Sequence, residues 1–230
     1  MGCDIHILFE KRELQGAPWR LFSPVVHCPR HSGTDKKCWQ CDAAGSAYYA
    51  NRNYHLFAIL GNVRNAFGTA GCKTAAGAFR FISEHRGVPD DASPQLRSIA
   101  NEEDFDAGYL GDHSLTHVSL KELVEFDWEQ KNVLTGIISA EAFLEWDGKW
   151  PEAYSGGIFG PGIRVVDYFV PALLQAPERW LEAQGNPSHV CVSWPVTYRQ
   201  AAGVAFMALV EALKAHGKPE NVRMVFGFDS

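Results

Sequence analysis

The sequence predicts an α+β fold, with a mixed or antiparallel sheet and helices mainly on one face of that sheet. Three observations support this class: a hairpin at the start of the chain, strands separated by helices further on, and no regular strand–helix–strand alternation. The chain carries no low-complexity linker and no internal repeat, so residues 1–230 are expected to form a single domain. A cysteine-containing loop over residues 27–45 is expected as an insertion after the first hairpin.

The segment 2–12 is the first expected strand. Alternation of side chains assigns one set to each face: Ile5, Ile7 and Phe9 against Asp4, His6, Leu8 and Glu10. The first set predicts core. The second set places Asp4 and His6 side by side, and such a pair can bind a metal ion or transfer a proton, because histidine titrates near neutral pH and a carboxylate can fix its tautomer. The alternative is a strand whose outer face is solvated.

A second strand is expected at 19–26, paired with the first, and the metal motif follows it. Cys28-x-x-His31 and Cys38-x-x-Cys41 flank a polar loop, and each spacing lets a tight turn aim two side chains at one ion. Three sulfurs and one nitrogen form the closed tetrahedral shell of structural zinc, with His27 as a reserve ligand. The alternative is three unrelated thiols and a surface histidine. The remaining cysteines, Cys3, Cys72 and Cys191, are predicted to be free thiols.

Three helices are expected in the next part of the chain. The first follows Asn53 as its N-cap and carries apolar residues at helical spacing up to Val63. The second covers 74–85, and the third begins at Ser93-Pro94 and runs to Ala100, because Ser caps a helix and Pro suits its first position.

The segment 111–119 combines Asp112, His113 and His117 with several hydroxyl side chains. Ser119 and Glu122 form a capping box, so these residues are expected in a loop that enters a helix, where unpaired backbone N–H groups favour an anion. The alternative for both histidines is local hydrogen bonding within the loop.

The rest of the chain is expected to alternate between strands and helices. The expected strands are 133–138, 163–166, 189–194 and 222–228, and the expected helices are 120–128, 139–146 and 196–216, with further helical turns from Pro171 and Pro177. A glycine-rich segment at 155–162 could bring the backbone close to a phosphate, or it could be a tight turn.

The composition excludes several classes of protein. With 46% hydrophobic and 21% charged residues, a wholly disordered chain is excluded. The net charge of -6 argues against a broad surface for duplex nucleic acid, although it does not exclude a local basic groove. The sequence contains no run of about 18 apolar residues, so no membrane span is expected. It also lacks a basic segment followed by an apolar run, so no secretion signal is expected. We therefore expect a cytoplasmic protein.

Two resemblances add to this reading. The start, Met-Gly-Cys-Asp-Ile-His, resembles a group of uncharacterised proteins from tailed phages and prophages, and the resemblance continues at 52–60, 86–91, 112–114 and 222–229. It implies a phage origin and the host cytoplasm, and the chain departs from the group at Gly111-Asp112, where the group has Asp-Gly. The loop 28–45 is similar to half of the zinc module of DnaJ-type chaperones, with His31 in place of a cysteine and Ala43 in place of a glycine. That similarity implies metal binding and not chaperone activity.

Two functions follow as hypotheses. In the first, a hydrolase or transferase acts on a nucleotide or nucleic acid with one pocket made of six residues: Asp4, His6, Arg52, Asn53, Asp112 and His113. Histidine would be the acid/base, Arg52 would hold the anion, and aspartate would orient the histidine or bind a second divalent metal ion. In the second, a non-catalytic phage protein binds and inhibits a host defence component. If His6 and His113 lie on opposite faces of the sheet, the second hypothesis becomes the better one.

Overall fold

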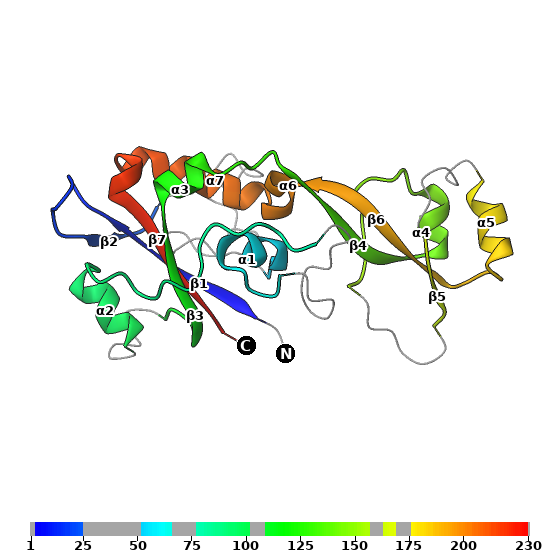
Figure 1. Cartoon of the computed structure of the whole chain (residues 1–230), viewed down its shortest axis with the longest axis horizontal. Helices are drawn as coiled ribbons and strands as arrows, with labels where there is room; N and C mark the ends of the chain where they lie inside the picture. Colours follow the sequence, from blue (N-terminus) through cyan, green and yellow to red (C-terminus); the bar gives the residue numbers. More distant parts are fainter. Residues whose placement is uncertain are drawn as a thin grey trace, which may run out of the picture.

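The computed structural model describes residues 3–24, 52–65, 77–101, 109–156, 163–168 and 176–229. Within these residues the strands form two sheets, with the orders β2-β1-β7-β3 and β4-β6-β5. All strand pairs are antiparallel except β5 with β6. The predicted α+β class is confirmed, but the prediction of a single sheet is wrong, because strands 4 to 6 pair only with one another. The second sheet extends from the main body as an arm (Figure 1).

The main sheet joins both ends of the chain. Its strands are β1 (Asp4–Lys11), β2 (Arg20–Phe22), β3 (His113–Ser119) and β7 (Val222–Asp229). The predicted hairpin of β1 and β2 is present. The central strand β7 pairs with β1 over its whole length, from Asp4 opposite Asp229 to Lys11 opposite Val222. β2 is shorter than the predicted strand 19–26, since residues 19, 23 and 24 are irregular, and residues 25 and 26 lie outside the described residues, as does the zinc motif.

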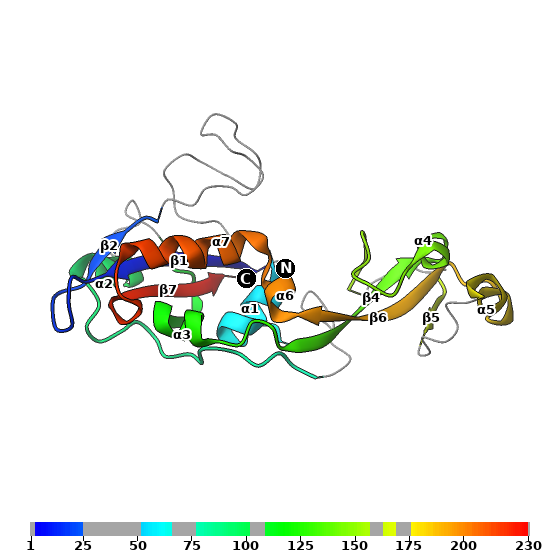
Figure 2. The ribbon, with the colours of Figure 1, turned by 90° about the horizontal axis from the view of Figure 1, so that it is seen from above.

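The core lies on the face of the main sheet that the alternation of side chains in the first strand predicted to be buried. Ile5, Ile7 and Phe9 are buried, as expected from their alternation. Helices that contribute buried residues to this core include α1 (Tyr54–Gly61), α3 (Leu120–Glu125), α6 (Tyr198–Ala202) and α7 (Val204–Leu213). Phe57 of α1 packs edge-to-face on Phe228 of β7, with ring centroids 5.2 Å apart. The opposite face holds a smaller cluster around Leu96 of α2 (Pro94–Ala100), so the helices do lie mainly on one face (Figure 2).

The arm contains β4 (Lys131–Ser139), β5 (Val165–Asp167) and β6 (His189–Thr197). Two short helices, α4 (Ala140–Glu145) and α5 (Pro177–Ala183), pack at its far end (Figure 1). β4 and β6 pair over nine residues each, and β6 also continues into α6 of the main body. No helix in the described ranges is long and apolar enough to span a membrane.

Three expected elements differ from the structure. The described part of the predicted helix 74–85 is irregular backbone, because the Asn65 side chain binds both the N–H and the C=O of Phe79. The long helix 196–216 is broken at Gly203, whose φ of +87° ends α6 before α7 begins, and a 3-10 turn, η3 (Lys214–His216), follows.

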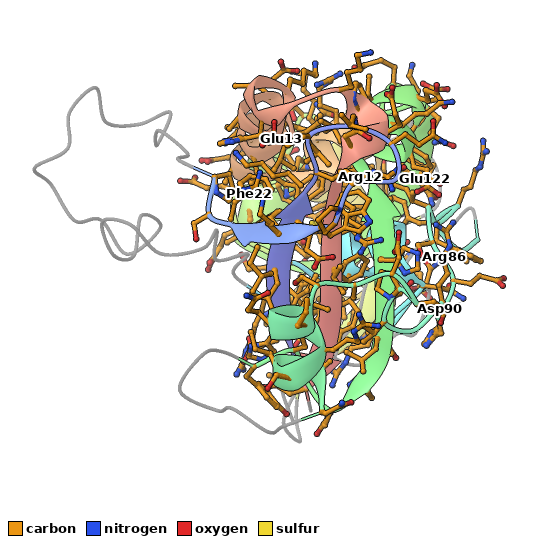
Figure 3. All side chains as sticks on the ribbon, turned by 90° about the vertical axis from the view of Figure 1, so that its left-hand side faces the viewer. Arg12, Glu13, Phe22, Arg86, Asp90 and Glu122 are labelled. Carbon is orange, nitrogen blue, oxygen red and sulfur yellow. The ribbon has the colours of Figure 1, made fainter. Side chains whose placement is uncertain are left out.

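The third difference concerns 111–119, which is mostly the strand β3 instead of a loop. Its apolar residues Leu115 and Val118 are compatible with a strand, and Ser114 (φ +56°) lies in an irregularity between His113 and Thr116. The Ser119–Glu122 capping box is confirmed at the start of α3. Arg86, in the irregular backbone that follows Phe79, forms an ion pair with Glu122 at 2.7 Å and so joins that backbone to α3 (Figure 3).

Candidate functional site

The candidate site lies at the end of the main sheet, where β1 begins and β7 ends. Asp4 faces Asp229 across the strand pair, and His6 faces Gly227. These residues share the face opposite Ile5 and Phe228, because side chains alternate along a strand. The sequence prediction that Asp4 and His6 lie together on the polar face is therefore confirmed.

His6 is bound to a residue that the sequence did not identify. Its Nε2 lies 3.0 Å from Oδ2 of Asp229, and Oδ1 of the same carboxylate accepts a hydrogen bond from the Asp4 N–H at 2.9 Å. The ring of Tyr109 contacts the imidazole edge-to-face, with centroids 4.8 Å apart. The His6 side chain stays 29% exposed, so a ligand in solution can reach it.

This geometry fixes the histidine tautomer. An ionised carboxylate can only accept, so Nε2 of a neutral His6 carries the hydrogen and Nδ1 becomes the basic nitrogen. Within the described residues no hydrogen bond reaches Nδ1. Burial alone would raise the pKa of Asp229, but hydrogen bonds from His6 and the Asp4 backbone, with the charge of Arg52, lower it overall. The carboxylate is thus ionised beside the imidazole at neutral pH.

Asp4 and Arg52 form an ion pair beside this dyad. Nε and Nη2 of Arg52 donate to the two oxygens of Asp4 at 2.8 and 3.0 Å, the bidentate arrangement typical of strong arginine–carboxylate pairs. The Arg52 side chain is 57% exposed, while that of Asp4 is 24% exposed. The predicted neighbours Asp4, His6 and Arg52 are therefore brought together, and an anion would have to compete with Asp4 for the guanidinium.

Asn53 has a structural role. Its side-chain oxygen accepts from the N–H of Leu56 at 3.2 Å, which confirms the predicted N-cap of α1. Its amide nitrogen donates to the carbonyls of Ala201 and Ala202 at 2.9 and 3.0 Å, and this fastens α1 to the end of α6. All of these bonds hold helix ends. Asn53 was predicted to line the pocket, but its side chain is not available to a ligand.

His113 lies on the other face of the sheet. It is opposite Phe228 in the register of β3 and β7, and Phe228 is opposite Ile5. Its ring stacks on Phe228 at 6.1 Å, and its Nδ1 bonds the Ser114 hydroxyl at 2.9 Å. Asp112 is exposed and bonds the Phe228 carbonyl through its backbone N–H. The prediction that His6 and His113 face one pocket is therefore wrong.

The backbone around Gly111 explains why His113 lies on the face opposite His6. Gly111 has a φ of +85°, and a Cβ on it would come 2.4 Å from the Phe228 carbonyl oxygen, so the backbone rests directly on β7. This contact, with the irregularity that follows it, sets the face on which His113 emerges. His117 lies nearer the middle of β3 and bonds the Gly87 carbonyl through Nδ1 at 3.1 Å, so its partner is 30 positions away and not within its own segment as the alternative expected.

No group of three or more His, Cys, Asp and Glu side chains in the described ranges is arranged to hold a metal ion. The predicted zinc ligands, Cys28, His31, Cys38 and Cys41, lie outside those ranges, as do the reserve ligand His27 and the free-thiol candidate Cys72. Cys3 is a buried free thiol, as predicted. Burial raises its pKa more than the nearby Arg64 lowers it, so the thiol stays protonated at neutral pH.

Two residues of the site were missed, Asp229 and Tyr109. Asp229 ends a strand and has no polar motif around it, and only the pairing of β1 with β7 brings it to His6. Tyr109 lies in the connection before β3. Comparisons with known proteins give no further guidance: no family model, no curated protein and no solved structure matches the chain.

Proposed function

We propose that the protein is a hydrolase or transferase in which His6, oriented by Asp229, acts as general acid/base. The observation that carries the proposal is the 3.0 Å contact between Nε2 and a carboxylate that is itself held by the Asp4 N–H. A carboxylate in this position stabilises the imidazolium that forms when Nδ1 takes a proton from water or a substrate hydroxyl. His6 would later return this proton to the leaving group.

The proposed substrate is a nucleotide or a nucleic-acid fragment. Arg52 supports this choice, because a guanidinium recognises phosphate in the same bidentate manner as carboxylate, and its side chain is 57% exposed. A phosphate group would replace the Asp4 carboxylate on Arg52, two residues along β1 from His6. The motif at the start of the chain supports a phage protein acting in the host cytoplasm, with the loop at 27–45 stabilised by zinc.

The test is a comparison of two histidine variants. Phosphate release from nucleoside triphosphates and cleavage of bis(p-nitrophenyl) phosphate would be measured over the pH range in which histidine titrates. His6→Gln keeps a donor toward Asp229 but cannot transfer a proton, so turnover should fall by roughly 10² to 10⁴. His85→Gln, at an exposed histidine whose two neighbours both bond Thr116 in the middle of β3, should leave it unchanged. A wild-type rate in His6→Gln, or no turnover by the wild type, would overturn the proposal.

The second candidate is a non-catalytic phage protein that binds and inhibits a host defence component. Separation of His113 from His6 favours it, because the six-residue pocket expected of the enzyme is reduced to three of its members. Exposed apolar side chains support it as well, including Val204 at 68% exposure. Phage plating on a defence-carrying host that expresses the chain would separate the two: the binding function predicts that His6→Gln retains the effect, and the catalytic function predicts its loss.

A further inference from the structure

Four aromatic side chains meet where the arm joins the main body. His55 comes from α1, Trp150 and Tyr154 from the segment after α4, and Trp194 from β6. The ring centroids of Trp150 lie 5.8 Å from His55, 6.3 Å from Tyr154 and 6.3 Å from Trp194, and Tyr154 lies 5.0 Å from Trp194. We call these four residues the aromatic cluster, and Figure 1 shows α1 beside the base of the arm.

The cluster is held in place by the surrounding backbone. Gly136 of β4 leaves room for two of the rings, because a Cβ there would come 2.6 Å from Cδ2 of Tyr154 and 2.9 Å from Cη2 of Trp194. Ser155 and Ile137 exchange two backbone hydrogen bonds of 2.9 Å, which fix the chain just after Tyr154 along the edge of β4. Tyr154 and Trp194 therefore occupy defined positions over the strand.

The cluster contains a buried donor without an acceptor. Nε1 of Trp194 is fully buried, and no acceptor among the described residues bonds it. A buried N–H left unpaired costs about 1–3 kcal/mol, and such groups are rare in folded proteins. An acceptor supplied by a ligand would remove this cost.

His55 adds a second polar group. Its ring lies between Trp150 and Phe79, with centroids at 5.8 and 6.1 Å, and burial lowers its pKa to about 4. The imidazole is therefore neutral and offers one donor and one acceptor. The part of the chain that the structure describes supplies no hydrogen bond to either ring nitrogen.

Solvent reaches the cluster through two of its rings. Trp150 is 39% exposed and Tyr154 is 37% exposed, and both present large apolar rings next to the buried Trp194. Exposed side chains change rotamer rapidly, so the Trp150 ring can move to admit a planar ligand beside Trp194. The site thus combines flat apolar surfaces with a donor and a neutral histidine.

We propose that the aromatic cluster binds a nucleobase, from a free nucleotide or from a single-stranded nucleic acid. A base is planar and stacks on aromatic side chains whatever its identity, and its edges carry acceptors and donors that match Trp194 Nε1 and His55. Binding of a base at the aromatic cluster does not require acid–base chemistry at His6.

Calorimetric titration tests this with three ligands: ATP, a single-stranded oligonucleotide, and ribose 5-phosphate, which has no base. The two ligands with bases should bind at the aromatic cluster, whereas ribose 5-phosphate can bind only through its phosphate at Arg52 and should bind more weakly than either. If the dissociation constants of ATP and the oligonucleotide, expressed per base, are equal, the ligand is a free nucleotide. If the oligonucleotide binds more tightly, the ligand is a single-stranded nucleic acid. Binding of ribose 5-phosphate as tight as that of ATP would overturn the proposal.

Variants locate the binding. Trp194→Phe keeps an apolar ring and removes Nε1, and it should weaken binding on the order of tenfold; Trp150→Leu removes an exposed ring and should weaken it similarly. Trp180→Phe, at α5 on the far end of the arm, is the matched control and should bind like the wild type. Unchanged affinity in both Trp194→Phe and Trp150→Leu would overturn the proposal. So would the absence of binding to any ligand with a base, which would assign the exposed rings to a protein partner instead.

Discussion

Arg223 and Glu10 face each other on β7 and β1, and their side chains form a buried ion pair in the main sheet. Nε and Nη2 of Arg223 donate to Oε2 of Glu10 at 2.8 and 2.7 Å. The other carboxylate oxygen of Glu10 accepts from the Ser93 N–H at 2.8 Å. Arg223 also donates to Asp91 at 2.6 Å and lies 3.9 Å above the Trp19 ring. The pair therefore fastens the loop before α2 and the β1–β2 connection to the sheet.

Glu10→Gln is predicted to destabilise the protein strongly. Among the described residues, the substitution leaves the buried Arg223 with the more exposed Asp91 as its one ion-pair partner, and breaking one side of a buried pair typically costs about 3–5 kcal/mol. Urea unfolding measures the free energy. The control is Glu13→Gln, which breaks the exposed pair of Glu13 with Arg20 (Glu13 is labelled in Figure 3) and should cost less than about 1 kcal/mol. Equal losses in the two variants would contradict the structural role of the buried pair.

Asp229→Asn is predicted to change the pH dependence of stability. The pKa of Asp229 is lower in the folded chain than its ordinary value, so the ionised carboxylate stabilises the fold. This contribution is complete above the ordinary pKa of about 3.9 and disappears as the pH falls through the lowered pKa. The difference in unfolding free energy between wild type and Asp229→Asn should shrink over that acidic range.

Asp112→Asn provides the matched comparison, because Asp112 is exposed at the same end of the sheet. Its unfolding free energy at neutral pH should lie within about 0.5 kcal/mol of the wild-type value, as is usual for exposed substitutions. A constant difference between wild type and Asp229→Asn down to strongly acidic pH would show that Asp229 does not act through its charge.

Gly203→Ala is predicted to destabilise the junction of α6 and α7. The Cβ itself has room, with the Asn53 amide nitrogen 3.7 Å away, but φ of +87° and ψ of 154° form a conformation that is strained for an alanine. A cost of about 1–3 kcal/mol in thermal or urea unfolding is expected. Gly136→Ala tests a different constraint, since its Cβ meets the aromatic rings and it should perturb near-UV circular dichroism as well. Wild-type stability of Gly203→Ala would mean that the two helices can join into one.

One zinc ion per chain is predicted at Cys28, His31, Cys38 and Cys41. Elemental analysis of protein purified from zinc-supplemented medium should find it, and Cys38→Ser should lose most of it because three ligands hold a structural zinc poorly. Cys72→Ser is the control and should retain the metal. His31→Ala and His27→Ala decide which histidine is the ligand. Protein without zinc, or Cys38→Ser with the full amount, would refute the site.

Features coded by neighbouring residues were predictable from the sequence. The burial of Ile5, Ile7 and Phe9 follows from a period of two, and the caps at Asn53 and Ser119 depend on bonds to residues three positions away. The helices α2 and α4 were found close to their expected bounds for the same reason.

Features set by distant contacts were not predictable. Asp229 reaches His6 through a strand pairing between residues 223 positions apart, and no property of either segment gives that register. The irregular backbone at Phe79 depends on the Asn65 side chain, although Phe79 and Ile82 have the spacing of a helix. The face of His113 depends on how Gly111 rests on β7, which the residue types alone do not reveal.

The pairing of β1 with β7 has a consequence for the order of folding. The Asp4 backbone bonds a side chain 225 positions later in the chain, and β7 is the only strand that connects β1 to β3 in the described sheet. During synthesis, β1 and β3 therefore emerge from the ribosome long before the strand that separates them. Such distant contacts slow folding, because the chain loses conformational entropy in closing the long loop between the two strands before their contacts can form. Until residue 229 has emerged, β1 and β3 each lack the strand that covers one edge in the folded sheet, and unpaired strand edges favour aggregation.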